Sequence, residues 1–292
     1  MQVALADGRA VGSFLASSTN AGEKDVLKPL LGSICIVGVF VLGLVACSAP
    51  GSGSTITVFA AASLTDAFND LAQEFERQNK NVDVLISYQG SSALRIQLAQ
   101  GASADVFASA DEFNMGLAIK AGVIAGKPQT FARNQLAIIV SRNSNVVSRL
   151  EDLSKPGLRL VTGDEMVPVG RYTTAALNRL AADPAFGTHF RDKFEGNIAS
   201  KESNVRRAVS KVEIGEADAA IGYVTDARGA GRDDLIAISI PKRYTEEIRY
   251  PIGMVARPAT KILAEAFISF VLSEDGQQIL RSHEFLPAKG SS

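Results

Sequence analysis

The sequence has few of the residues that build redox, zinc or acid–base centres. Among 292 residues there are two cysteines, two histidines and no tryptophan. Both cysteines, Cys35 and Cys47, lie near the N-terminus, so the chain beyond Cys47 has no thiol for a disulfide or a zinc-thiolate site. His189 and His283 belong to no catalytic motif, and the G-x-S-x-G elbow of serine hydrolases is absent. We therefore expect a protein that is not an enzyme and carries no cofactor.

The sequence also lacks an excess of charge of either sign. Lys and Arg total 30 against 31 for Asp and Glu, which gives a net charge of −1. A nucleic-acid partner normally requires a broad basic surface, and an anionic membrane surface requires the same. We expect neither, so a partner must be recognised locally.

The N-terminal residues read as an export leader. Lys24 and Lys28 precede an uncharged run from Pro29 to Ala46, and Leu44–Ala46 then lead into Cys47 and the small residues 48–54. This order is typical of a signal peptide over residues 1–46, and its end resembles the lipobox of bacterial lipoproteins, which implies lipidation of Cys47 and a flexible linker over 47–54. An uncleaved membrane anchor is the alternative. The 28 residues before the run are long for a leader, so translation could start near Val26 or Leu27.

From residue 55 onward, short apolar runs alternate with helical patterns, which indicates strand–helix units and mainly parallel sheets. Ser63 and Asp66 have the spacing of a capping box, so a helix should begin at Ser63. Further helices should follow Ser91, Pro168 and Asn204. Strands are expected over residues 55–60, 82–87, 105–108, 135–140, 158–162, 219–224 and 252–256, and the last helices over 261–272 and 276–283.

Four segments share one design, in which a strand runs into a loop of small or hydroxyl residues and a helix starts there. They cover residues 58–64, 87–93, 161–170 and 201–205. Ligands bind at the carboxyl ends of parallel strands, and helix N-termini offer free N–H groups and partial positive charge. Four such starts around one cleft could hold a small dianion without Lys or Arg. Singly, each is more simply explained as an ordinary cap or loop.

These segments resemble the molybdate-binding proteins that serve ABC importers. Residues 57–67 (TVFAAASLTDA) are similar to the opening motif of that family, and the order of the later motifs is similar too. The later motifs are residues 90–111, which include Gly90-Ser91-Ser92, then 163–172, 204–206 and 222–227. The resemblance extends from about Thr55 to Pro287.

The resemblance implies a two-lobed α/β fold of the periplasmic-binding-protein type, each lobe a mainly parallel sheet flanked by helices. Lobe 1 would comprise 55–134 with 257–292, and lobe 2 would comprise 135–256. It implies high-affinity capture of molybdate or tungstate outside the cytoplasmic membrane, hinge closure over the anion, and delivery to a permease and its ATPase by a monomer tethered through Cys47 or free in the periplasm.

The family's oxyanion ligands can be transferred to this sequence motif by motif. Hydroxyls are implied at Ser63, Ser91 and Tyr223, backbone N–H groups at Val169 and Val205, and Ser92 could share or replace the role of Ser91. The metal would be held as its oxyanion, with no protein ligand to a cation. Val169 stands where the family usually has alanine, so its methyl groups could narrow the cavity. Ser103 stands where proline is common.

Other cargoes and other protein classes stay open at this point. The same fold could bind sulfate, phosphate or another small anion, and a phosphate site would need a carboxylate acceptor such as Asp164 or Asp226. A transcription-regulator effector domain is a further alternative, but no helix-turn-helix is found. Arg171, Arg206 and Arg207 are interpreted as solvated helix-face side chains that could steer anions inward.

Overall fold

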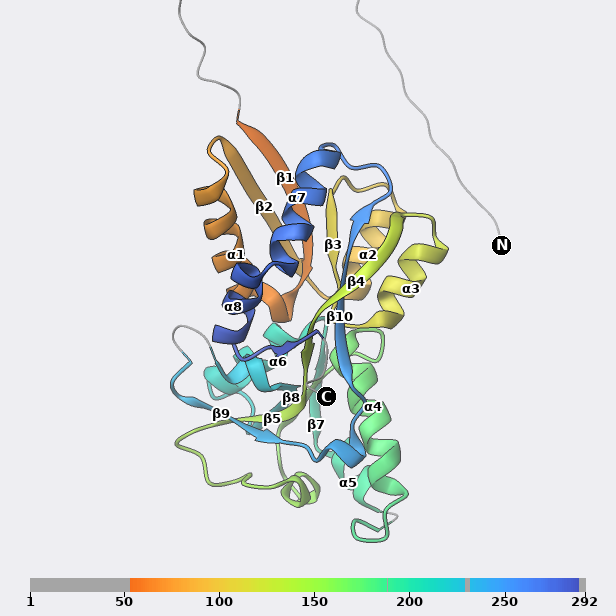
Figure 1. Cartoon of the computed structure of the whole chain (residues 1–292). Helices are drawn as coiled ribbons and strands as arrows, with labels where there is room; N and C mark the ends of the chain where they lie inside the picture. Colours follow the sequence, from red (N-terminus) through yellow and green to blue (C-terminus); the bar gives the residue numbers. More distant parts are fainter. Residues whose placement is uncertain (1–52, 188, 229–231, 289–292) are drawn as a thin grey trace, which may run out of the picture. The chain divides into compact units, whose positions relative to one another are not determined.

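The computed structural model describes residues 53–187, 189–228 and 232–288. The predicted leader and Cys47 lie outside these residues. The described residues all fall within one compact unit, residues 48–292, which contains two sheets (Figure 1). No helix within the described ranges is both long and apolar enough to cross a membrane.

The larger sheet has six strands in the order β11-β4-β10-β3-β1-β2. Its strands are β1 (Ser54–Ala61), β2 (Val82–Gln89), β3 (Val106–Ala108), β4 (Ile124–Asn134), β10 (Ile248–Val255) and β11 (Leu286–Pro287). β1 pairs in parallel with β2 and β3, whereas β10 pairs antiparallel with β3 and β4. The sheet is therefore mixed, with its parallel strands at one side.

The smaller sheet has five strands in the order β7-β6-β8-β5-β9. Its strands are β5 (Leu136–Ser141), β6 (Leu160–Gly163), β7 (Ile198–Glu202), β8 (Ala219–Tyr223) and β9 (Leu235–Ser239). β6 pairs in parallel with β7 and β8, and β5 pairs antiparallel with β8 and β9. The two-lobed, helix-flanked α/β fold is confirmed, but both sheets are mixed rather than mainly parallel.

The chain passes between the sheets twice. β4 ends at Asn134 in the larger sheet and β5 begins at Leu136 in the smaller one. The chain returns through β10, which pairs with β3 and β4 of the larger sheet. The expected second lobe of residues 135–256 therefore extends too far, because 248–255 belong to the first sheet.

Helices cover both faces of the larger sheet. They are η1 (Ala62–Leu64), α1 (Thr65–Gln78), α2 (Ser91–Ala99), α3 (Glu112–Lys120), α7 (Lys261–Leu272) and α8 (Glu274–Ser282). The alternation of β1 sends Val58 to the face covered by α1 and α7, and Phe59 to the face covered by α2 and α3. On the first face, Phe68, Phe75 and Phe267 pack edge to face, with ring centres 5.3–6.3 Å apart.

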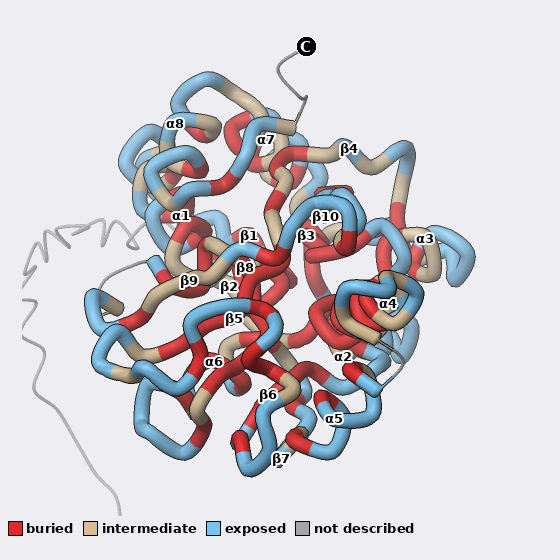
Figure 2. The backbone as a smooth tube through the Cα atoms, turned by 90° about the horizontal axis from the view of Figure 1, so that it is seen from below, coloured by how far each residue is buried: buried red, intermediate tan, exposed pale blue. Residues whose placement is uncertain are grey.

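The second lobe has the same layered build. Its helices are η2 (Leu150–Ser154), α4 (Pro168–Ala181), α5 (Phe190–Gly196), α6 (Val205–Glu213), η3 (Val224–Ala227) and η4 (Lys242–Tyr244). Every residue of β8 is buried because helices cover both faces of the sheet. Figure 2 shows this arrangement, with buried backbone along the central strands and exposed backbone on the outer helices and loops.

Candidate functional site

A small pocket lies where the parallel strands of both sheets end. β1, β2, β6, β7 and β8 each lead into it at their carboxyl ends, and its cavity volume is about 10 Å³. This is far below the roughly 300–1,000 Å³ of sites for drug-sized ligands, so the pocket suits only a very small ligand such as an ion of a few atoms. It is lined by Ala61, Ala62, Ser63, Gln89, Gly90, Ser91, Ala110, Val167, Pro168, Val169, Asn204, Val205 and Tyr223.

The structure brings together the five residues that the sequence motifs selected. Ser63 and Ser91 come from the first lobe, and Val169, Val205 and Tyr223 come from the second. Ser92 is buried next to Ser91 but does not line the pocket. The geometry therefore favours Ser91 over Ser92 for the hydroxyl at this helix start.

Ser91 is oriented by the loop that follows β3. Its Oγ accepts a hydrogen bond from the backbone N–H of Ala110 at 3.0 Å, so its own proton remains free to be donated. The first backbone bond of α2 runs from the N–H of Leu94 to the carbonyl of Gly90. The N–H groups of Ser91 and Ser92 precede that bond and are among those a helix start leaves without an intrahelical acceptor.

Ser63 is not the helix cap that its spacing predicted. The 3-10 turn η1 occupies residues 62–64, α1 begins at Thr65, and neither start has a side-chain cap. Ser63 Oγ instead lies 3.1 Å from the hydroxyl of Tyr250, which is 187 residues away in the sequence. The capping-box prediction was wrong because this tertiary hydrogen bond takes the hydroxyl away from the local backbone.

The second lobe presents two helix starts. Pro168 occupies the first turn of α4, and the first backbone bond of that helix is from Arg171 N–H to Val167 carbonyl, so the N–H of Val169 precedes it. Asn204 caps α6 by accepting from the N–H of Arg207 at 3.0 Å, which leaves the N–H of Val205 outside this cap. Both helices therefore direct partial positive charge towards the pocket.

The larger side chain of Val169 is accommodated by a glycine. A Cβ placed on Gly163 would lie 2.4 Å from a γ-carbon of Val169, so the valine occupies space that only glycine leaves open. At least one of its methyl groups therefore packs against Gly163.

Tyr223 brings a hydroxyl that has no partner. Its side chain is 1% exposed, and its Oη has no hydrogen-bond partner among the described residues. Burial raises its pKa well above the usual value, so the phenol keeps its proton. A buried unpaired hydroxyl normally costs about 1–3 kcal/mol, so a donor in this position points to a bound acceptor.

The side-chain amide oxygens of the pocket are already engaged by protein donors. Gln89 Oε1 accepts from Gln97 at 3.1 Å, and Asn204 Oδ1 accepts from Arg207 N–H. The pocket lining, which lies within the described ranges, contains no charged side chain. Asp164 and Asp226, considered as acceptors for a proton-bearing anion, are not in it. The site can therefore donate several hydrogen bonds to an anion but offers no carboxylate to a ligand proton.

Nothing among residues 53–187, 189–228 and 232–288 groups three or more His, Cys, Asp or Glu residues at a site that could hold a metal cation.

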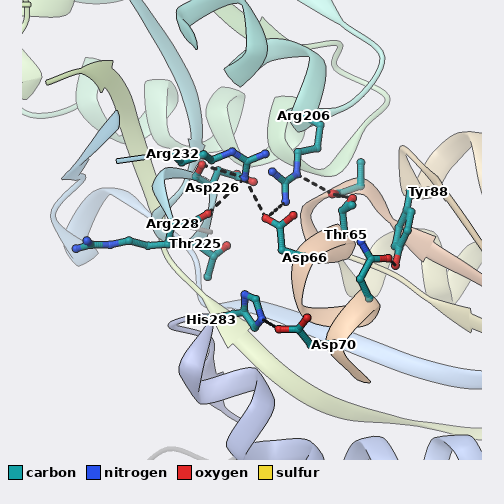
Figure 3. A network of polar contacts seen from close by, with 12 residues as sticks. Thr65, Asp66, Asp70, Tyr88, Arg206, Thr225, Asp226, Arg228, Arg232 and His283 are labelled. Carbon is teal, nitrogen blue, oxygen red and sulfur yellow. Dashed lines mark hydrogen bonds and ion pairs between the residues drawn. The ribbon is translucent and has the colours of Figure 1, made fainter. Parts of the chain in front are cut away.

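Charged side chains connect the two lobes around the pocket. Arg206 on α6 pairs with Asp66 on α1 and donates to the carbonyl of Ala62 at 3.2 Å, and Arg232 reaches the same carboxylate at 3.2 Å (Figure 3). Elsewhere at the interface, the Arg171 guanidinium lies 3.6 Å from both the Asp111 carboxylate and the ring centre of Phe113.

The interpretation of these arginines as solvated side chains was therefore wrong for Arg206, whose side chain is 16% exposed. Arg171 also contacts the opposite lobe but is 38% exposed, and Arg207 is 67% exposed and pairs with Glu202 of its own lobe. No local pattern in the sequence could have found the contact between Asp66 and Arg206, because the two residues are 140 positions apart.

Comparisons with known proteins show the family to which the chain belongs. The profile of the bacterial extracellular solute-binding proteins matches residues 56–286. The molybdate-binding protein ModA of Mycobacterium tuberculosis is 34% identical over 261 residues, covering 86% of this chain and 95% of that protein.

Solved structures show the same fold. The periplasmic molybdate-binding protein of Azotobacter vinelandii matches with a TM-score of 0.69 at 23% identity, covering 79% of this chain and 98% of that one. The sulfate-binding protein SubI of M. tuberculosis matches with a TM-score of 0.70 at 21% identity, covering 80% and 87%. The chain belongs to the bacterial extracellular solute-binding proteins and, within them, to the group that contains the ModA proteins.

Proposed function

We propose that this protein captures molybdate, or its close analogue tungstate, outside the cytoplasmic membrane and delivers it to the permease and ATPase of an ABC importer. The observation that carries the proposal is the uncharged pocket in which hydroxyl and N–H donors converge and no carboxylate faces the ligand. Molybdate carries no proton at neutral pH, so all its oxygen atoms accept hydrogen bonds. Charge-assisted bonds from such donors are about twice as strong as neutral ones.

Five donors would hold the anion. Ser63, Ser91 and Tyr223 would donate from their hydroxyls, and Val169 and Val205 from their backbone N–H groups. Ser63 and Ser91 belong to one lobe and the other three to the opposite lobe, so an anion that contacts both sets stabilises the closed arrangement. The ion pairs that Asp66 and Arg171 form across the interface would further stabilise the closed arrangement.

Sulfate is the alternative cargo that the site itself allows. It is also a tetrahedral anion without a proton at neutral pH, and a sulfate-binding protein shares the fold. Sulfate is smaller than molybdate, so the distance between the donors of the two lobes decides between them. Phosphate is disfavoured, because it keeps a proton and the pocket offers no carboxylate to accept it.

The protein would act by binding alone. The serines of the pocket bond to Ala110 and Tyr250 rather than to a histidine or a carboxylate, so neither has a base to make it a nucleophile. We propose no catalytic role, no cofactor beyond the transported anion, and a monomeric binding protein.

Attachment to the membrane through a lipid on Cys47 is proposed from the sequence, and a free periplasmic form is the alternative. Cys47→Ser would then release the protein from the membrane fraction into the soluble fraction. If the variant stays embedded in the membrane, the apolar run is an uncleaved anchor instead.

Calorimetric titration of the chain from Ser48 onward with molybdate, tungstate, sulfate and phosphate tests the cargo. We expect tight binding of the first two and much weaker binding of the others. In thermal unfolding, a ligand at 100 times its Kd adds about 2.7 kcal/mol to the free energy of unfolding. Tight binding of sulfate or phosphate with no response to molybdate would overturn the assignment.

A further inference from the structure

A chain of buried hydrogen bonds leads from the junction between the lobes to the pocket. Asn134, the last residue of β4, donates from Nδ2 to the hydroxyl of Tyr250 at 3.4 Å and to Thr225 Oγ1 at 2.9 Å. The Tyr250 hydroxyl lies 3.1 Å from Ser63 Oγ, which lines the pocket. Asn134, Tyr250 and Ser63 are all buried, so water does not compete for these bonds.

The amide of Asn134 fixes which group donates and which accepts in this series of hydrogen bonds. Asn134 Oδ1 accepts from the backbone N–H of Gln135 at 2.8 Å, which identifies the other amide atom, the one facing Tyr250, as the NH₂ group. An NH₂ group can only donate, so Tyr250 Oη accepts from Asn134 and its own proton must point elsewhere. Its remaining polar neighbour is Ser63 Oγ.

We propose that Asn134 and Tyr250 set the specificity of the site by making Ser63 a hydrogen-bond donor to the ligand. Because Ser63 Oγ accepts a hydrogen bond from the Tyr250 hydroxyl, the hydroxyl proton of Ser63 itself is directed into the pocket. At this position the site then favours a ligand oxygen without a proton over one that carries a proton, because a ligand proton would meet the proton of Ser63. Tyr250 is a positioning residue in this scheme, and it does not touch the anion.

Two further observations fit this scheme. Burial raises the pKa of Tyr250 well above its usual value, so the phenol keeps the proton that it donates. The second pocket serine, Ser91, is also a donor towards the ligand, because its Oγ accepts a hydrogen bond from Ala110 N–H and its own proton is free. Both serines therefore face the ligand as donors. The inference rests on the proposed oxyanion binding, because it explains which oxyanions are accepted.

The test compares molybdate with arsenate, a tetrahedral oxyanion that keeps at least one proton at neutral pH. The ratio of the arsenate Kd to the molybdate Kd is measured for the unchanged protein and for Tyr250→Phe, in which Ser63 can rotate and accept. We expect the ratio to fall about tenfold, the equivalent of one hydrogen bond. Tyr244→Phe is the matched control, since it removes the hydroxyl of another buried tyrosine, which bonds to Asp183, and neither residue is in the pocket lining.

A double-mutant cycle separates this role from simple packing. The Ser63→Ala protein lacks the last hydroxyl of this series of hydrogen bonds. Adding Tyr250→Phe to it should therefore leave the ratio of the arsenate Kd to the molybdate Kd within about twofold of its value in Ser63→Ala alone. An equal change in both backgrounds would overturn the inference, and so would a Tyr250→Phe ratio no different from that of Tyr244→Phe. If Tyr250→Phe does not fold, Asn134→Ala replaces it with the same expected direction. A protein that binds neither molybdate nor tungstate would instead refute the proposed function.

Discussion

The guanidinium of Arg206, on α6 of the second lobe, pairs with the carboxylate of Asp66, on α1 of the first lobe. Arg232 reaches the same carboxylate at 3.2 Å and also bonds to Glu213 of its own lobe at 2.9 Å. The side chains of both arginines are largely buried, so solvent screens these contacts less than it screens an ordinary surface pair. One acidic side chain thus holds two basic side chains of the opposite lobe.

Asp66→Asn should weaken closure of the lobes over the anion. We expect the molybdate Kd to rise roughly fivefold to tenfold, mainly through faster dissociation, because the lost contacts exist only when the lobes meet. Stopped-flow release of the anion measures the rate. Asp70→Asn is the matched control on the same helix, because Asp70 pairs with His283 within the first lobe (Figure 3). Equal effects of the two substitutions would contradict a role for Asp66 in closure.

Gly90→Ala should keep the lobes apart. A Cβ on Gly90 would lie 2.5 Å from the carbonyl oxygen of Ser203 in the other lobe, closer than real contacts allow. Since that backbone cannot move aside without opening the interface, we expect the molybdate Kd to rise by at least about tenfold, the equivalent of 1.4 kcal/mol lost from binding. Gly116→Ala is the control, because a Cβ at that position in α3 meets nothing within 4 Å. Unchanged affinity in Gly90→Ala would show that the lobes close in another way.

Tyr223→Phe separates binding from stability. The hydroxyl has no partner within the described protein, so its removal should leave the ligand-free protein as stable as before or slightly more stable. Binding should weaken by about tenfold or more, because a donor to an anion contributes roughly 1.5–3 kcal/mol. Thermal unfolding without and with molybdate measures both effects. A loss of stability without ligand, together with unchanged affinity, would assign Tyr223 to the core rather than to the site.

The free energy of unfolding should depend on pH through the protonation of Asp226. Loss of hydration raises the pKa of this buried carboxyl to about 6, although nearby Arg206 and the N–H of Tyr223 at 2.8 Å act in the opposite direction. The folded state therefore binds this proton more tightly than the unfolded chain, so its contribution to stability is present at low pH and is lost as the pH rises from about 4 to about 6.

Asp226→Asn should be more stable than the unchanged protein at neutral pH, by roughly 2–3 kcal/mol, and about equally stable near pH 4. Urea unfolding across this range measures the difference. A difference that stays constant between the two pH values would contradict the raised pKa.

The sequence predicted three of the four helix starts around the pocket, all except Ser63, because their signals are local. Ser91, Pro168 and Asn204 each precede an apolar period, and α2, α4 and α6 begin at or next to these residues. β4 was not predicted, because Gly126 and Pro128 inside it normally indicate a turn. β10 was predicted to start at Ile252, four residues late, so Tyr250 was overlooked.

The polar partners of the site could not be predicted from spacing. Ser63 meets Tyr250 across 187 residues, and Asn134 meets Tyr250 across 116. The second pair arises because β4 and β10 lie side by side in the folded sheet, and the first joins η1 to β10. The motifs thus indicated which residues line the pocket, whereas the contacts that orient their protons depend on tertiary structure.

The most direct test of the account is anomalous diffraction from crystals grown with molybdate. We predict one molybdenum peak in the pocket, with its oxygen atoms at about 2.7–3.1 Å from the hydroxyls of Ser63, Ser91 and Tyr223 and from the N–H groups of Val169 and Val205. A peak held instead by the guanidinium of Arg171 or Arg206, or no peak in the pocket, would contradict the account.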